Sequence, residues 1–237
     1  MKVRLRAGTS GFSFSEWKGP FYPEKLPAKD MLSFYAGRFS TVEINNTFYR
    51  MPSPALFEPW IAQVPDDFRF AIKAPQRLTH IKRLKECEEP LTILFRVIAT
   101  LGTKLGPVLF QLPPNFRKDL ARLEAFFAAM PPGRPARLAF EFRHGSWFDD
   151  ETMAVLRAHG AALCLADTGE EPIAPLAATA DFGYLRLRRE EFSDEDLSQW
   201  VLKIHAQPWS EAFVFLKHEE EGRGPKLAAR LMEIAGE

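Results

Sequence analysis

Short apolar segments rich in β-branched and aromatic residues recur along the chain, and most are separated by stretches whose apolar positions have helical spacing. They recur about once per 30 residues, which is the length of one βα unit. Eight strands are predicted, at Val3–Ala7, Thr41–Asn45, Arg69–Lys73, Val108–Gln111, Leu138–Phe142, Ala162–Ala166, Tyr184–Leu187 and Ala212–Leu216. Strands that alternate with helices pair in parallel, in a closed barrel or in an open doubly wound sheet. The count of eight favours a single TIM-type (β/α)8 barrel of the α/β class.

Capping residues and apolar spacing mark the intervening helices. They are predicted at Met31–Phe39, Pro54–Gln63, Cys87–Leu105, Leu120–Met130, Glu151–His159, Ser193–His205 and Pro225–Ala235. Between strands six and seven, residues 171–181 contain two prolines and leave little room for a helix. No linker or change in composition divides the chain, so residues 1–237 are expected to form one domain.

The open alternative lacks its usual signatures. No G-x-G-x-x-G follows the first strand, residues 8–11 do not open a helix, and there is no Walker phosphate loop. The chain has 31 basic and 31 acidic residues, so no overall field attracts nucleic acid or an anionic membrane. With no apolar run near the roughly 18 residues of a membrane span and only two cysteines, we expect a cytoplasmic protein without a membrane partner.

Polar residues collect at the predicted carboxyl ends of the strands, where TIM-type barrels carry their active sites. These residues are Glu43, Asn45, Lys73, Gln111, Glu141, Arg143, Asp167 and Arg186. Buried parallel strands are normally apolar throughout, so a charge inside them is costly unless it is paired or used. Glu43 and Glu141 therefore have two interpretations: a structural ion pair with neighbouring cations, or catalytic acid-base groups. Asp167 is a further catalytic candidate, and capping the turn that follows it is the alternative.

Loops after the strands add aromatic residues and histidines. Trp17, Tyr49 and Trp147 could stack on a sugar or base, with Arg50 supplying charge, which leaves open a non-catalytic module that binds a nucleotide or single-stranded nucleic acid. His80 and His144 are expected at the same mouth. Together with His218 and the carboxylates they could hold a divalent metal in a hydrolase or nuclease, although no H-x-H or H-E-x-x-H spacing supports this alternative. No cofactor is predicted.

Several blocks in order resemble the domain-of-unknown-function 72 family, also called YecE-like. They are residues 8–13 with Trp17, residues 43–50, Lys73 with residues 79–80, residues 111–114, residues 141–147 and Asp167. The resemblance implies a TIM-type barrel and no established reaction. The chain departs from the family pattern at residues 187–189 and at residues 217–219, after strands seven and eight.

Taken together, the residues predict a barrel whose mouth binds an anionic small molecule bearing phosphate or carboxylate. Lys73, Arg143 and Arg186 would orient the anion, and Asn45 and Gln111 would donate hydrogen bonds to it. Glu141 would be the acid or base, with Glu43 orienting it or sharing its proton. A carboxylate near several cations should stay ionised and serve as a base, whereas two facing carboxylates would raise the pKa of one of them and create an acid. The separation of the two carboxylates would decide between these alternatives.

Overall fold

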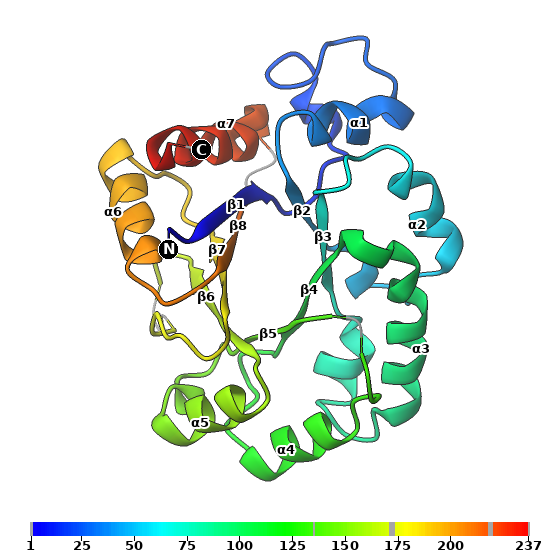
Figure 1. Cartoon of the computed structure of the whole chain (residues 1–237), viewed down its shortest axis with the longest axis vertical. Helices are drawn as coiled ribbons and strands as arrows, with labels where there is room; N and C mark the ends of the chain where they lie inside the picture. The colour runs from blue at the N-terminus through cyan, green and yellow to red at the C-terminus, as the bar shows by residue number, and fades with distance from the viewer. Residues whose placement is uncertain (1, 135, 171–173, 218–219, 237) are drawn as a thin grey trace.

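The structure is a computed structural model that describes residues 2–134, 136–170, 174–217 and 220–236. All of its named strands belong to one parallel sheet with hydrogen-bonded order β1-β8-β7-β6-β5-β4-β3-β2. The strands are β1 (Arg4–Thr9), β2 (Thr41–Ile44), β3 (Arg69–Lys73), β4 (Leu105–Gln111), β5 (Leu138–Glu141), β6 (Ala162–Asp167), β7 (Phe182–Leu187) and β8 (Glu211–Leu216). The sheet curves into a nearly closed ring (Figure 1), so the prediction of a TIM-type (β/α)8 barrel is confirmed.

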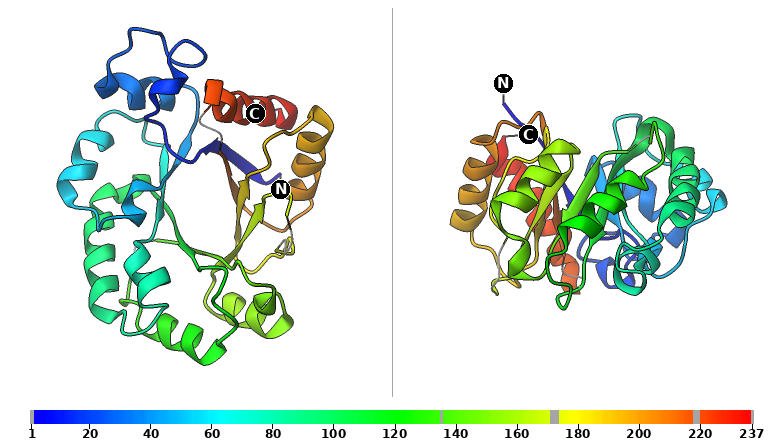
Figure 2. Two further views of the ribbon diagram at one scale, coloured as in Figure 1. Left: turned by 180° about the vertical axis from the view of Figure 1, so that it is seen from behind. Right: turned by 90° about the horizontal axis from the view of Figure 1, so that it is seen from below.

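Helices lie outside the ring of strands, as views from both ends show (Figure 1, Figure 2). They are α1 (Met31–Ala36), α2 (Pro54–Ile61), α3 (Glu88–Ile98), α4 (Leu120–Ala128), α5 (Asp150–Ala158), α6 (Asp194–His205) and α7 (Arg223–Ala235). Residues 174–181, before β7, contain no helix, as the two prolines suggested; residues 171–173 lie outside the described part of the chain. No helix in the described ranges combines the length and apolar character needed to span a membrane.

Side-chain caps occur at the start of some helices and not of others. The Asp149 carboxylate accepts the Thr152 amide at the start of α5, and Ser193 forms a capping box at the start of α6. The predicted helix Cys87–Leu105 was too long. It ends at Ile98 and continues as a 3-10 segment, Ala99–Lys104, which contains Gly102 at a φ of 56°, a backbone conformation that interrupts a helix.

Two layers of apolar side chains fill the molecule. The larger lies between the strands and the outer helices, and the smaller fills the inside of the ring, where it includes Ala71, Leu109, Cys164, Phe213 and Phe215. The ring interior is thus a packed core and not a channel, as in other barrels of this type. A ligand has room only above this core, at one of the two rims.

The amino-end rim is closed by charged residues. Arg6 on β1 is buried; its guanidinium contacts Glu211 and donates to the Asp67 carboxylate at 2.8 Å. Arg137 donates to the other Glu211 oxygen at 2.6 Å and lies 4.7 Å from the Phe182 ring centroid. These cations are satisfied by carboxylates and an aromatic face, so this rim holds the barrel together.

A tyrosine hydroxyl bridges the seam between β1 and β2, which are not neighbours in the hydrogen-bonded order. The Thr9 amide donates to the buried Tyr35 hydroxyl at 2.8 Å, and that hydroxyl donates to the Thr41 carbonyl at 3.1 Å. A Cβ atom on Gly8 would lie 2.2 Å from the same carbonyl oxygen, so only glycine permits this approach of the two strands. The hydroxyl replaces a missing ladder bond and closes the ring.

Candidate functional site at the carboxyl-end mouth

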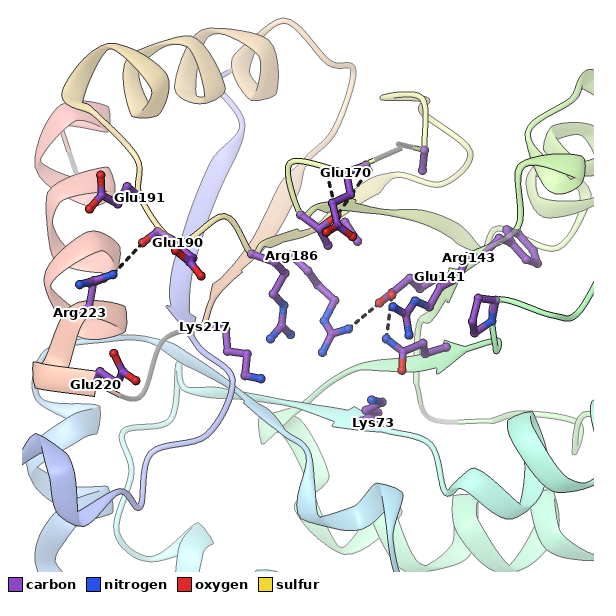
Figure 3. Close-up of a pocket in the computed structure, with 17 residues that line it drawn as sticks. Lys73, Glu141, Arg143, Glu170, Arg186, Glu190, Glu191, Lys217, Glu220 and Arg223 are labelled. Atoms are coloured by element: carbon purple, nitrogen blue, oxygen red, sulfur yellow. Dashed lines mark hydrogen bonds and ion pairs between the residues drawn. The ribbon is translucent and has the colours of Figure 1, made fainter. Parts of the chain in front are cut away.

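A cavity of about 1110 Å³ opens at the carboxyl ends of the strands (Figure 3). Its lining includes Lys73 from the end of β3, Gln111 from β4, Glu141 from β5 and Arg186 from β7. The predicted convergence of these distant residues at one rim is what the structure shows. We call this space the mouth cavity.

Glu43 lies at the bottom of the mouth and is completely buried. Its carboxylate accepts five side-chain hydrogen bonds, from Ser10 (2.8 Å), Asn45 (3.0 Å), Tyr184 (2.8 Å), Arg186 (2.9 Å) and Arg188 (3.1 Å). Both carboxylate oxygens are therefore engaged within the protein. Since Glu43 does not line the mouth cavity, it acts on anything bound there only through its partners.

Glu141 reaches the cavity itself. One of its oxygens accepts from the Gln111 amide at 2.7 Å, a contact that follows from the pairing of these two residues in the β4–β5 ladder. The other accepts from Arg186 at 2.6 Å. The Arg186 guanidinium thus bridges the Glu43 and Glu141 carboxylates. The two carboxylates form no hydrogen bond with each other, so they do not share a proton.

Both carboxylates are ionised at neutral pH. Burial alone would raise the pKa of Glu43, but the charges of Arg186 and Arg188 hold it well below its usual value. For Glu141 burial again opposes ionisation, and Arg186 with the Gln111 amide lowers the pKa below its ordinary range. Of the two alternatives that the sequence left open, this arrangement fits an ionised carboxylate beside cations and not a carboxylic acid with a raised pKa.

Lys73 differs from the paired arginines. Its ammonium lies 4.1 Å from the Phe48 ring centroid, and among the described residues no carboxylate forms an ion pair with it. Burial and the positive charge of Arg186 lower the pKa of Lys73 to about 8. Lys73 therefore remains mostly protonated at neutral pH, with its charge available to a ligand.

Charge in the mouth cavity is distributed unequally. Arg186 and Arg188 balance Glu43 and Glu141, which leaves Lys73, Arg143 and Lys217 as additional positive charges of the lining. Arg143, which the sequence predicted to orient the anion, is exposed, as is Lys217. Around Arg223, the residues Glu190, Glu191 and Glu220 form what we call the acidic rim, and Glu170 adds a further carboxylate to the lining (Figure 3). An anion is therefore favoured deep in the cavity and disfavoured at this rim.

Other predicted residues lie elsewhere. Trp17 is buried against Phe14 and other rings, and Trp147 is stacked on Phe142 at 4.4 Å; neither lines the mouth cavity, so the structure places both in the core. Arg50 is exposed and lines no described cavity. None of the four residues suggested to bind a nucleotide therefore lines the mouth cavity. Tyr49, the fourth, lines a second cavity beside it.

Asp167 faces away from the mouth. Its neighbour Ala166 lines the cavity, so alternation along β6 directs Asp167 to the other face, where it accepts from Arg189 at 2.8 Å and from the Gly169 amide at 3.2 Å. Turn capping, the alternative to catalysis, is the arrangement observed. Asn45 and Gln111 likewise donate to the carboxylates of Glu43 and Glu141, so each positions a carboxylate.

The histidines do not assemble a metal site in the described part of the chain. His80 packs its ring 4.9 Å from that of Phe48, and the His144 imidazole accepts the Ser146 amide. Neither lines the mouth cavity, and His218 lies outside the described residues. Within residues 2–134, 136–170, 174–217 and 220–236, no three His, Cys, Asp or Glu side chains meet in a geometry that could hold an ion.

Three partners of Glu43 were missed by the sequence reasoning, namely Ser10, Tyr184 and Arg188. Tyr184, Arg186 and Arg188 alternate along one face of β7 and its extension, so the period of two that marks a strand could have found two of them. Arg188 belongs to residues 187–189, where the sequence was expected to depart from the family pattern, and it supplies a contact within the site.

A parallel barrel with outer helices and a charged cavity at its carboxyl-end mouth defines a TIM-type barrel protein with a candidate ligand site. The chain belongs to the DUF72 family, since the family model, described as a protein of unknown function, matches residues 6–237. YunF of Bacillus subtilis is 26% identical over 216 residues, which cover 84% of this chain and 74% of YunF.

Two further comparisons agree with this membership. YecE of Escherichia coli strain K12 is 32% identical over 118 residues, which cover 49% of this chain and 43% of YecE. The match thus spans less than half the length of that relative. The crystal structure of a DUF72 family protein from Thermotoga maritima superposes with a TM-score of 0.87 at 30% identity, covering 99% of this chain and all of that one.

Proposed function

We propose that the protein is an enzyme whose mouth cavity binds a small molecule bearing a phosphate or carboxylate group. The observation that carries the proposal is the Lys73 ammonium, which lines the cavity without an ion-pair partner among the described residues. Arg188 adds a second donor: its Nη2 atom donates to Ser10 and Glu43, whereas its Nη1 atom forms no hydrogen bond with the described residues. An ammonium that no carboxylate neutralises, next to a guanidinium that keeps an N–H group available, is what an anion requires.

The same cavity holds a proton acceptor and a proton donor. Glu141 lines the cavity and is ionised, which suits a general base. Lys73, with its pKa lowered to about 8, can release a proton close to neutral pH and suits a general acid. Glu43 positions the two arginines from below. In this scheme Glu141 and Lys73 act on the ligand, and Glu43 is a positioning residue.

Calorimetric titration with methyl phosphate at pH 7.5 tests the binding step. Replacing Lys73 by Gln removes one charge-assisted contact, so affinity should fall roughly tenfold to hundredfold. Lys25→Gln is the matched control, because Lys25 is exposed and lines neither cavity. Equal affinity in the Lys73 variant and the wild type, or no binding of methyl phosphate or acetate by the wild type, would reject the proposal.

A substitution of Glu141 is expected to change the affinity for methyl phosphate in the opposite direction. Glu141→Gln removes a negative charge from the wall of the cavity, so methyl phosphate should bind more tightly to this variant than to the wild type. Weaker binding with an unchanged unfolding midpoint would mean that Glu141 serves only to hold Arg186 in place for the anion.

A further inference from the structure

A second cavity of about 810 Å³ adjoins the mouth cavity. Four cationic residues line both spaces and so form a common boundary; they are Lys73, Arg186, Arg188 and Lys217. Beyond this boundary the lining is mostly apolar and includes five aromatic residues, Phe12, Phe14, Phe48, Tyr49 and Trp60. We call the second cavity the aromatic lobe. Its size lies in the range of natural small-molecule sites.

The rings of the aromatic lobe are held by packing. Phe12 meets Trp60 edge to face at 5.5 Å, and Trp60 stacks on the buried Phe70 at 5.8 Å. Phe48 is fixed by an edge-to-face contact with His80. These rings belong to the loop after β1, the 3-10 turn after β2 and helix α2, so three separate segments converge on one space. A preformed wall of this kind costs little ordering when a ligand enters.

Tyr49 is the exposed ring of the aromatic lobe, since the other four are half-buried. Its side chain is 75% exposed, and of the large hydrophobic residues that are exposed among the described residues, which also include Ile81 and Leu202, it is the one that lines a cavity. Tyr49 packs edge to face on Phe48 at 5.2 Å, which leaves most of its ring exposed and able to cover a ring bound in the aromatic lobe.

Phe48 contacts the cationic boundary and also lines the aromatic lobe. The Lys73 ammonium sits 4.1 Å from its ring centroid, and both residues line the aromatic lobe. An anion bound to Lys73 therefore lies next to an aromatic wall, at the point where the two cavities meet. A group attached to that anion has two directions open to it: the mouth cavity with its acidic rim, or the aromatic lobe.

We propose that the ligand is an aromatic anion, with its phosphate or carboxylate at the cationic boundary and its planar ring in the aromatic lobe. This inference rests on the proposed function and narrows its ligand class. Aromatic rings favour edge-to-face and offset stacked contacts with other rings, and the lobe provides five of them. The acidic rim lies in the other cavity and does not oppose a ring placed here.

A comparison of methyl phosphate with phenyl phosphate tests the aromatic subsite separately from the anion site. Both compounds are phosphate monoesters, and only phenyl phosphate carries an aromatic ring. Binding of each is measured by calorimetry at pH 7.5 to the wild type, to Tyr49→Ala, to Phe12→Leu and to Leu202→Ala. Tyr49 is exposed and Phe12 half-buried, so these variants are expected to fold, which circular dichroism verifies. Leu202 is a matched exposed control that is 62% exposed and lines neither cavity.

We expect phenyl phosphate to bind the wild type at least about tenfold more tightly than methyl phosphate. This ratio should fall at least about threefold in Tyr49→Ala and in Phe12→Leu and stay unchanged in Leu202→Ala, with methyl phosphate affinity constant throughout. Equal binding of the two esters, or a ratio that survives both substitutions, overturns the aromatic subsite and leaves the anion site standing. If neither ester binds, the proposed function fails and the inference fails with it.

Discussion

Replacing Glu43 by Gln removes the negative charge at the centre of the buried cluster. Five donors surround the carboxylate, and both arginines keep their charge after the substitution. A glutamine offers a single acceptor oxygen, and its amide group adds a donor where donors already converge. Breaking a buried ion pair from one side costs about 3–5 kcal/mol. For a chain of this size that corresponds to a fall of roughly 6–20 °C in the unfolding midpoint.

Urea unfolding followed by circular dichroism at pH 7 measures the loss directly. Glu190→Gln is the matched control, since Glu190 is an exposed carboxylate of the acidic rim, and it should change the free energy of unfolding by no more than about 0.5 kcal/mol. A loss below about 1 kcal/mol in Glu43→Gln would show that the arginines do not depend on this carboxylate and would refute the reasoning.

The pH dependence provides a second test of the same carboxylate. The pKa of Glu43 is held well below its ordinary value of 4.5, so its stabilising contribution is complete above that value and is lost as pH falls below it towards the pKa of the folded state. The wild type should therefore lose its stability advantage over Glu43→Gln progressively below about pH 4.5. A constant difference between pH 7 and pH 3 would contradict the assignment.

Three further outcomes are expected. Tyr35→Phe leaves the Thr9 amide and the Thr41 carbonyl without their shared partner, which should cost about 1–3 kcal/mol in urea unfolding; no loss would mean that water replaces the hydroxyl. Arg6→Met opens the amino-end rim and should lower stability by about 1.5–3 kcal/mol while the Kd for methyl phosphate stays constant, since Arg6 is remote from the mouth; a weakened Kd would disprove that separation. Affinity for methyl phosphate, which is dianionic above pH 7.5, should fall as pH rises through about 8 because Lys73 loses its proton, and Lys73→Gln should abolish this dependence.

The convergence of the site could be predicted because the fold itself produces it. Once eight strands are read as a closed parallel barrel, their carboxyl ends must share a rim, and Glu43, Lys73, Gln111, Glu141 and Arg186 each stand near such an end. The residue types at these positions then predict a charged mouth. No pairwise distance was needed for that step.

What could not be predicted is the direction of side chains outside the strands. Trp17 and Trp147 follow strands closely but turn into the core, because a large ring in a short 3-10 turn packs wherever neighbouring rings leave space. Asp167 was predictable in principle, since alternation with Ala166 fixes its face, yet the sequence does not say which face is inward. The aromatic lobe depends on three segments meeting, and Trp60 has no sequence signal linking it to the loop after β1.

Which cations of the mouth are paired with carboxylates also could not be predicted from the sequence. The pairing of Arg186 with both carboxylates, which leaves Lys73 unpaired, depends on side-chain geometry at the level of individual hydrogen bonds. The sequence alone predicted that Lys73, Arg143 and Arg186 lie near the mouth, without indicating which of them would be neutralised. That distinction separates a structural cluster from an anion site.

The central claim is that an anion binds where Lys73, Arg188 and Lys217 line both cavities. Tungstate has the shape and charge of a phosphate, and its anomalous scattering locates it without ambiguity in a crystal of the wild-type protein. We expect a tungstate ion within hydrogen-bonding distance of the Lys73 ammonium and the Arg188 guanidinium, and loss of that ion in Lys73→Gln crystals. An ion bound only beside Arg223 at the acidic rim, or a mouth that holds no ion at saturating tungstate, would contradict it.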